Sequence, residues 1–309
     1  MTRSRLAPSP TGAQHLGNAR THLIAYWAAQ QAGQELLLRI DDLDSPRVKA
    51  WAVQQAIDDL AWLGIECHGA PVIQSSHQQH YQQILERLTD ATAGLAYRCA
   101  CSRNDIAEAL SAPHESRFRG EGPIYPGICR PPDGRQASAE DSYWRLRASE
   151  QQLVFHDRVL GTQGCCPADE LGDFPMTTRS GQVSYQLAVV IDDHLQGVDT
   201  VVRGNDLVAS TFRQLQIHQL LGWDPPAYAH VPLVLGVDGR RLAKRHGDTR
   251  LSFYRENGVS ASQVVGWAAY SLGLIDRQEP CAARDLITQF DWKKLSAEPT
   301  VIDPVTLFG

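Results

Sequence analysis

Apolar residues follow alternating strand and helix periodicities along the first 95 residues. A continuous aliphatic run over 35–40 has the length and composition of a buried strand. Helical spacing of apolar residues predicts helices over 19–32, 50–63 and 74–91. Gly64 and Gly94 follow the last two of these helices, at the position where glycine commonly ends a helix. Strands that alternate with helices are typical of an open parallel α/β sheet.

Residues 96–180 depart from this alternation. Cysteine, glycine, proline and arginine are dense over 98–132, and residues 143–147 and 152–160 have the pattern of strands in an antiparallel insert. A loop or a hairpin turn is expected over 173–181. The insert therefore interrupts the parallel sheet.

The alternating pattern returns after the insert. The apolar run 183–191 has strand length, 197–203 is a further short strand, and Asp206 is expected to cap the helix that follows. Helices are expected over 207–221, 262–272 and 281–290. We expect four segments: the first half of the sheet domain (1–95), the insert (96–180), the second half of the sheet domain (181–225) and a C-terminal part with a basic loop and helices (226–309).

Composition is that of a folded protein outside the membrane. Hydrophobic residues make up 43% and charged residues 21% of the 309 residues, which is typical of a globular protein with a substantial core. No apolar run approaches the length of a membrane span, and no secretory signal is seen. A net charge of −6 argues against general binding to nucleic acid but not against a local basic groove. Seven cysteines, an odd number, favour a reducing cytoplasmic location with some thiols free or bound to metal.

The stretch from Arg5 to Asn18 has the composition of an anion-binding turn. It reads as a strand, a loop with proline and glycine, and the start of a helix, whose unpaired N–H groups and dipole attract negative charge. His15 adds a side-chain donor, and Gly17 leaves room for a ligand against the backbone. No Gly-Lys-Ser/Thr sequence of a Walker loop follows. Taken alone, the stretch also fits an ordinary turn with a surface histidine.

Charged residues gather after the predicted strands. Because ligands bind at the carboxyl edge of a parallel sheet, these residues are candidates for a binding site, with arginine as the natural bidentate partner of a substrate carboxylate. Surface ion pairs are the alternative interpretation. The residues are Asp41, Asp42, Asp44, Asp192, Asp193, Arg203 and Asp206, with Tyr185 nearby.

Residues 239–248 form a basic, glycine-flanked loop. Its lysine, Lys244, suits a polyphosphate whose negative charge grows in a transition state. A second arginine cluster lies in the insert, at Arg117, Arg119, Arg130 and Arg135. A solvated basic face is the alternative for both clusters.

Three cysteines of the insert have spacing compatible with a metal site. Cys99 and Cys101 fit a tight turn, and Cys129 can return as a third thiolate. Tyr125 or His114 can supply the fourth ligand that zinc requires, although a tyrosine ligand is rare because the metal must displace the phenol proton. Three unlinked cysteines in a small subdomain are the alternative.

Four ordered segments resemble motifs of the class I glutamyl-tRNA synthetases. Residues 5–18 resemble the family's "HIGH" element, 38–47 the strand that follows it, 202–211 a later substrate segment, and 241–245 the "KMSKS" loop. The resemblance extends from Arg5 to about Leu274. It is strongest to the short members of the family, which lack the anticodon-binding domain and transfer glutamate to queuosine in tRNA(Asp).

The resemblance implies an α/β fold: a Rossmann-type parallel-sheet catalytic domain with a zinc-containing α+β insert and a C-terminal helical subdomain. It implies activation of L-glutamate by ATP with Mg²⁺, and one structural Zn²⁺. The implied glutamate-binding residues are Arg5, Leu6, Ala7, Pro8, Ser9, Asp41, Tyr185 and Arg203. The implied ATP-binding residues are His15, Gly17, Asn18 and Lys244, of which His15 and Lys244 are the catalytic ones. The implied metal ligands are Cys99, Cys101, Tyr125 and Cys129.

Three positions depart from the family's pattern. Asp41 stands where the family usually has glutamate, so the shorter side chain reaches a substrate amine only through water or yields that role to a neighbour. Ala243 replaces the middle serine of the "KMSKS" loop and Arg241 its first lysine. Lys244 is retained, and on that basis we expect an active enzyme.

The resemblance leaves three functions to compare. The first is glutamate transfer to queuosine at the wobble position of tRNA(Asp), by a monomeric cytoplasmic enzyme. The second is a truncated glutamyl-tRNA synthetase that charges a tRNA 3′ end, and the third is a non-catalytic tRNA-binding paralogue. The chain's end at Gly309, soon after its helical tail, favours the first over a full-length synthetase.

Overall fold

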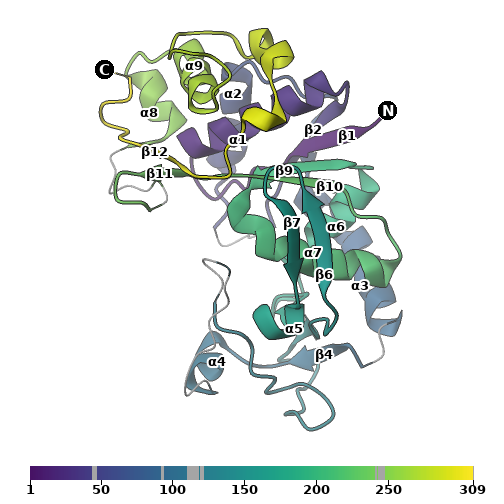
Figure 1. The fold of residues 1–309 in the computed structure, drawn as a ribbon. Coiled ribbons are helices and arrows are strands. Elements are labelled where there is room, and N and C mark those ends of the chain that lie inside the picture. The colour runs from purple at the N-terminus through teal and green to yellow at the C-terminus, as the bar shows by residue number, and fades with distance from the viewer. Residues whose placement is uncertain are drawn as a thin grey trace.

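The computed structural model describes residues 1–43, 47–91, 94–109, 118, 122–240, 242 and 248–308 (Figure 1). Within them lies a seven-stranded sheet with the strand order β3-β2-β1-β9-β10-β6-β7. Its strands are β1 (Arg3–Leu6), β2 (Glu35–Ile40), β3 (Val72–Ile73), β6 (Leu153–Asp157), β7 (Gly161–Cys165), β9 (Thr200–Gly204) and β10 (Ala227–Val231). Neighbouring strands run parallel except for β6 and β7, which form an antiparallel hairpin.

The strand order reverses between β1 and β9. β2 and β3 lie on one side of β1, whereas β9 and β10 lie on the other. In an open α/β sheet a ligand binds beyond the carboxyl ends of the strands at such a reversal. The ends of β1, β2, β9 and β10 are therefore the place to look for a site.

Helices cover both faces of the sheet. They are α1 (Leu16–Gln31), α2 (Ala50–Trp62), α3 (Gln78–Ala91), α6 (Tyr185–Leu195) and α7 (Val208–Leu221). Leu23, Ile24 and Trp27 of α1 are completely buried. Since α1 packs between the sheet and the C-terminal helices, it is apolar on most of its faces.

A second, three-stranded antiparallel sheet projects from the main sheet, at the lower end of the molecule in Figure 1. It contains β4 (Ala96–Cys99), β5 (Tyr143–Leu146) and β8 (Phe174–Pro175), and α4 (Arg103–Ala109) and α5 (Pro167–Glu170) lie beside it. The strand expected over 143–147 is therefore confirmed, with antiparallel partners on both sides.

The C-terminal part packs on α1. Its elements are β10, the parallel pair β11 (Val234–Gly236) and β12 (Thr300–Ile302), and the helices α8 (Leu251–Glu256) and α9 (Ala261–Ser271). Short 3₁₀ helices complete the fold: η1 (Gln74–His77), η2 (Asn205–Leu207), η4 (Ala283–Gln289) and η5 (Trp292–Lys294). The indole N–H of Trp27 donates to the Ala283 carbonyl at 2.8 Å, so α1 and the C-terminal residues share one core.

The strand expected over 183–191 is wrong, because residues 185–191 form the first part of α6. Residues 187–193 are all buried, since α6 packs against α3 and α7 as well as the sheet domain. A short apolar run without a polar face does not distinguish a buried helix from a buried strand. Asp192 and Asp193 consequently lie inside a helix, rather than after a strand end.

The strand expected over 152–160 exists but lies outside the insert. β6 pairs in parallel with β10, through Asp157 and Tyr228, and belongs to the main sheet. β10 itself follows the expected boundary at residue 225, so the sheet domain extends into the C-terminal segment. Sequence patterns predict where a strand lies but do not specify a partner some 70 residues away along the chain.

Two details of the helices also differ from expectation. Asp206 lies within η2, and α7 begins after Leu207 without a side-chain cap. Residues 283–289 form a 3₁₀ helix where an α-helix was expected over 281–290.

Among the described residues, no helix combines the length and the apolar character needed to cross a membrane.

Candidate active site and metal centre

The loop between β1 and α1 is fixed at both of its ends. The Asp41 amide donates to the Pro8 carbonyl at 3.0 Å, which places the first half of the loop beside the end of β2. The Leu16 amide donates to the Thr249 carbonyl at 3.1 Å, and His15 pairs with Arg250 in an isolated β-bridge. The segment that follows the basic loop therefore lies against the N-terminus of α1.

His15 caps α1 with its ring. Its Nδ1 accepts hydrogen bonds from the backbone N–H groups of Gly17 at 3.1 Å and Asn18 at 3.3 Å. The Asn18 side chain accepts in return from the His15 amide, which completes a capping box. Because Nδ1 accepts, the ring proton of neutral His15 resides on Nε2, and this atom is a donor suited to a phosphate oxygen.

Gly17 gives the His15 ring the room that capping requires. A Cβ at this position would lie 3.0 Å from Cε1 and 3.1 Å from Nδ1 of that ring. The same Cβ would lie 3.7 Å from the Val234 side chain of β11. The sequence predicted that Gly17 makes room for a ligand; the structure shows that it also makes room for the cap.

Arg203 lies at the end of β9, in the buried part of the site. Its Nη2 donates to Thr211 at 2.7 Å and to Gln214 at 2.8 Å, and its Nε donates to His230 at 3.1 Å. Nη1 is buried and has no hydrogen-bond partner among the residues that the structure describes. An unpaired buried donor is costly, by about 1–3 kcal/mol, and a ligand carboxylate at Nη1 would remove this cost.

Arg5 and Asp41 belong to a buried ion cluster centred on Arg39. Arg39 donates from Nε to Asp41 at 2.7 Å and from Nη1 to Asp193 at 2.6 Å. Arg5 Nε lies 3.3 Å from the same Asp193 carboxylate. These ion pairs link the end of α6 to the ends of β1 and β2.

The two carboxylates of this cluster respond differently to burial. Burial raises the pKa of Asp41, and Arg39 only partly offsets the effect. Burial also disfavours the charge of Asp193, but the guanidinium groups of Arg5 and Arg39 outweigh it and lower the pKa of Asp193. Asp41 is thus held by Arg39 instead of pointing freely at a ligand, in keeping with its shorter side chain.

Tyr228 connects the residues predicted to bind glutamate. It is a buried residue of β10, and its ring lies 5.3 Å from the guanidinium carbon of Arg203. Burial raises the pKa of its phenol, and the charged or polar groups that also act on this pKa include Arg203, Arg5 and Tyr185. Three predicted residues, from β1, α6 and β9, therefore act electrostatically on one phenol that the sequence did not single out. The sequence feature that could have indicated Tyr228 is an aromatic residue in a short strand next to the site.

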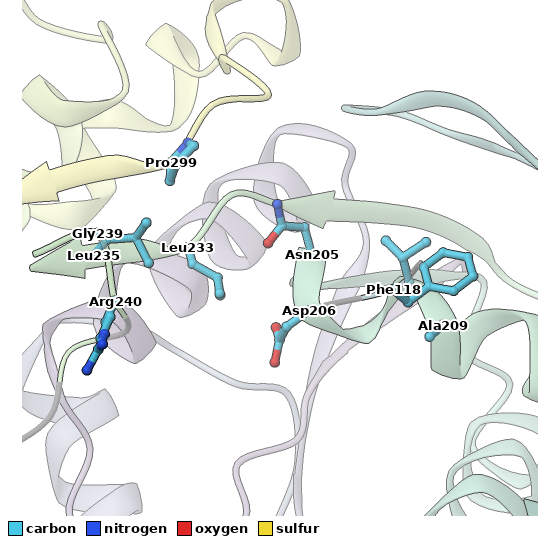
Figure 2. A pocket seen from close by; sticks show the side chains of 10 residues that line it. Phe118, Asn205, Asp206, Ala209, Leu233, Leu235, Gly239, Arg240 and Pro299 are labelled. Carbon is cyan, nitrogen blue, oxygen red and sulfur yellow. The ribbon is translucent and has the colours of Figure 1, made fainter. Parts of the chain in front are cut away.

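A cavity of about 670 Å³ lies beyond the ends of β9 and β10 (Figure 2). Asn205 and Asp206 lie on one side, Leu235, Gly239 and Arg240 on the other, and Pro299 closes it from the C-terminal part. Asp206, expected as a helix cap, instead contributes a carboxylate to the cavity wall. The cavity borders the basic loop, of which Arg241, Ala243, Lys244 and Arg245 lie outside the described residues.

The remaining predicted residues are placed less centrally. Tyr185 begins α6 and is 37% exposed, so its phenol is available to a ligand. Leu6 is buried in β1, and Ala7, Pro8 and Ser9 follow it in the loop.

Asp44, His114, Arg117 and Arg119 lie outside the described residues. Arg130 forms a two-pronged ion pair with Asp173 at 2.8 and 2.9 Å, and is therefore not part of an open basic face.

Cys99, Cys101 and Cys129 form a compact, buried cluster in the projecting part of the molecule. Their sulfur atoms all lie within 4.8 Å of one another. The Tyr125 hydroxyl lies 3.5 Å from the sulfurs of both Cys99 and Cys101, and it accepts from the Cys129 amide at 2.8 Å. Three thiolates at these separations could hold a metal ion, and thiolates are the ligands that structural zinc sites prefer.

The thiols of the cluster differ in pKa, because burial raises the pKa of Cys101 to about 11 whereas that of Cys99 is lowered. Burial would raise the pKa of Cys99, but hydrogen bonds with the Tyr125 and Tyr143 hydroxyls outweigh it and lower this pKa to about 7. Arg145 stacks over the Tyr125 ring at 3.9 Å and donates to the Tyr143 hydroxyl at 2.7 Å. Such second-layer contacts orient metal ligands.

The chain is similar to known proteins over nearly its whole length. Residues 1–307 match the family model described as tRNA synthetases class I (E and Q), catalytic domain. The glutamyl-Q tRNA(Asp) synthetase of Rhodopirellula baltica is 48% identical, over 97% of this chain and 96% of the relative. That of Symbiobacterium thermophilum is 42% identical, over 98% and 96%.

Longer proteins match as well. Glutamate–tRNA ligase 1 of Gluconacetobacter diazotrophicus is 38% identical over 92% of this chain, which covers 61% of the ligase. A solved glutamate tRNA ligase of Elizabethkingia meningosepticum, in complex with its amino acid, superimposes with a TM-score of 0.81 and 23% identity. That superposition covers 99% of this chain and 68% of the ligase chain, and it shows a shared fold.

Proposed function

Because the chain belongs to the class I tRNA synthetases for glutamate and glutamine, a family of ligases, we propose that it activates L-glutamate with ATP and transfers it to queuosine in tRNA(Asp). The observation that carries the proposal is the pairing of two anion sites at one edge of the sheet. One is Arg203 with its unpaired Nη1, and the other is the N-terminus of α1 with His15.

In the first step, the α-carboxylate of glutamate attacks the α-phosphate of ATP. Glutamyl-adenylate forms and pyrophosphate leaves. His15 Nε2–H binds a phosphate oxygen beside the positive end of the α1 dipole, since the N–H groups of Leu16, Gly17 and Asn18 are already paired within the protein. Lys244 stabilises the charge that grows on the leaving pyrophosphate. The Mg²⁺ that accompanies ATP neutralises part of the same charge. The protein contributes position and electrostatic stabilisation, and no side chain bonds covalently to the substrate.

Glutamate lies between Arg203 and the loop of residues 7–9. Arg203 pairs with its side-chain carboxylate, because the α-carboxylate must face the ATP phosphates. Tyr185 and Tyr228 line the remaining sides, and Arg5 contributes positive charge next to Asp193. Asp41 acts on the substrate amine indirectly, since Arg39 already holds its carboxylate.

In the second step, a hydroxyl of the queuosine cyclopentenediol attacks the carbonyl carbon of the adenylate. An ester bond forms, AMP leaves with the electron pair of the broken C–O bond, and the hydroxyl proton passes to solvent or phosphate. The full-length relatives named glutamyl-Q tRNA(Asp) synthetase support this acceptor, because they match at 42–48% identity over 96% of their own lengths.

Transfer of radiolabelled glutamate to purified tRNA tests the acceptor. We expect labelling of tRNA(Asp) that contains queuosine, and none of tRNA(Asp) with guanosine at the wobble position or of tRNA(Glu). Labelled tRNA(Glu) would indicate a truncated synthetase. Absence of glutamate-dependent ATP–pyrophosphate exchange, which needs no tRNA in this proposal, would exclude activation altogether.

The cysteine cluster is proposed to hold one structural zinc ion. Cys99, Cys101, Cys129 and Tyr125 are its ligands, as their mutual spacing supports. The ion would join the end of β4 to the segment that carries Tyr125 and Cys129. It lies in the projecting part of the molecule and takes no part in the chemistry of activation.

Replacing Cys101 with serine is expected to release the zinc and destabilise the projecting part, because a weaker ligand replaces a thiolate. Elemental analysis should find about one zinc per wild-type chain and almost none in the variant. Cys281→Ser is the matched control, since this half-buried thiol lies outside the cluster and its loss should leave zinc unchanged. A wild-type protein that binds no zinc after reconstitution would refute the proposed site.

A further inference from the structure

Asp157 is a buried carboxylate at the end of β6, behind Arg203 as seen from the substrate site. Its Oδ1 accepts from the Val159 and Leu160 amides at 2.9 Å each. Its Oδ2 accepts from the His230 amide at 3.0 Å and approaches His230 Nδ1 at 2.7 Å. Burial opposes ionisation, but these hydrogen bonds outweigh it and lower the pKa of Asp157. Asp157 is therefore an ionised acceptor.

The Asp157 carboxylate fixes the tautomer of His230. An acceptor at 2.7 Å requires the ring proton on Nδ1, which leaves a lone pair on Nε2. That lone pair faces Arg203 Nε, which donates to it at 3.1 Å, and the Thr211 hydroxyl, which lies 3.0 Å from it. Burial lowers the pKa of His230 to about 4, so the ring is neutral at physiological pH. The chain of donors then runs in one direction, from Arg203 through His230 to Asp157.

The hydrogen-bond acceptors of Arg203 are all neutral. They are an imidazole nitrogen, the Thr211 hydroxyl and the Gln214 amide oxygen. Arg5 and Arg39, by contrast, face the Asp193 carboxylate. Among the residues that the structure describes, no carboxylate pairs directly with Arg203. A buried cation without an anionic partner is unfavourable until a ligand supplies the anion.

We propose that Asp157 and His230 are positioning residues that hold the Arg203 guanidinium by its Nε and leave its charge for the side-chain carboxylate of the substrate. This inference rests on the proposed activation of glutamate. Its consequence is selection by charge: glutamate brings the missing anion, whereas glutamine, which has the same length, leaves the Arg203 charge unpaired. Discrimination between these two amino acids thus depends on residues that touch neither of them.

Substitutions at His230 distinguish its role in positioning Arg203 from the effect of its side-chain volume. His230→Leu removes the acceptor of Arg203 Nε, and we expect the KM for glutamate in ATP–pyrophosphate exchange to rise about 10- to 100-fold. The KM for ATP should stay within about twofold, and the preference for glutamate over glutamine should fall in the same proportion as the KM rises. His230→Gln offers a neutral amide oxygen near the position of Nε2 and should restore most of the wild-type value.

Asp157→Asn is a second test that does not alter the size of the core. It weakens control of the His230 tautomer and should raise the KM for glutamate about 3- to 10-fold without changing that for ATP. His156→Leu, at an exposed position of the same strand, is the control and should behave as wild type. If His230→Leu does not fold, the KM values for glutamate of Asp157→Asn and His230→Gln test the inference.

Two results would overturn the inference. One is a KM for glutamate within twofold of wild type in Asp157→Asn and His230→Leu, and the other is an equal rise of the KM values for glutamate and ATP. Wild-type protein inactive with glutamate would instead refute the proposed function.

Discussion

Replacing Arg203 with leucine is expected to lower kcat/KM for glutamate activation by about 1000-fold, mostly through KM. The substitution removes the buried cation that we propose pairs with the substrate carboxylate, and it keeps a side chain of comparable bulk. Arg203→Lys retains the charge but loses the planar fork, which is bound at Nε and Nη2, and should lower kcat/KM by about 10- to 100-fold.

The measurement is ATP–pyrophosphate exchange over a range of glutamate concentrations, with ATP saturating. Arg158→Leu is the control, because this arginine is exposed and lies beyond the end of β6. We also expect the ligand-free Arg203→Leu protein to melt no lower than about 5 °C below wild type, since an unpaired buried cation is lost together with its hydrogen bonds. If the KM for glutamate of Arg203→Leu stays within threefold of wild type, Arg203 does not contribute to substrate binding.

Much of the sheet's first half was predictable from the sequence. Residues 35–40 form β2 with the expected bounds, and α2 ends next to Gly64, which has the positive φ that favours glycine. These elements depend on local periodicity, which short windows of sequence record well. The ends of β1 and β9 also meet at one edge, as parallel strands require, so Arg5 and Arg203 both act on Tyr228.

The rest depended on pairings between distant segments. Asp157 and His230 lie in β6 and β10, which pair across some 70 residues, and neither residue stands in a recognisable motif. Asp193 was noticed as a charge but assigned to a strand end, because α6 has no polar face to mark it as a helix. Its pairing with Arg39, a residue that the sequence left unremarked, follows only from the packing of α6 beside β2.

The cysteine cluster illustrates the same limit on a smaller scale. Spacing alone left both Tyr125 and His114 open as the fourth ligand, although tyrosine is a rare ligand. In the structure, the segment from Tyr125 to Cys129 turns back on itself, so that the Cys129 amide donates to the Tyr125 hydroxyl at 2.8 Å. This turn places the phenol oxygen beside two sulfurs, a closeness that residue spacing does not determine.

The second large effect is expected at Lys244, which lies outside the described residues. Its loop is bounded by residues that are placed: Gly239 and Arg240 line the cavity, and Thr249 and Arg250 contact the N-terminus of α1. We expect Lys244, which stands in this interval of the sequence, to bind phosphates held at α1. Lys244→Ala should therefore lower kcat for glutamate activation by about 100- to 1000-fold, because charge grows on the leaving pyrophosphate only in the transition state.

The same variant should change the KM for glutamate by less than about threefold, since glutamate is proposed to bind at the Arg203 end of the site. This division between kcat and KM is opposite to that expected for Arg203→Leu, so the two variants test the two ends of the site independently. Lys294→Ala, an exposed lysine of the C-terminal part, is the matched control. Equal kcat values for Lys244→Ala and wild type would show that the loop's other cations, Arg240 among them, stabilise the pyrophosphate without Lys244.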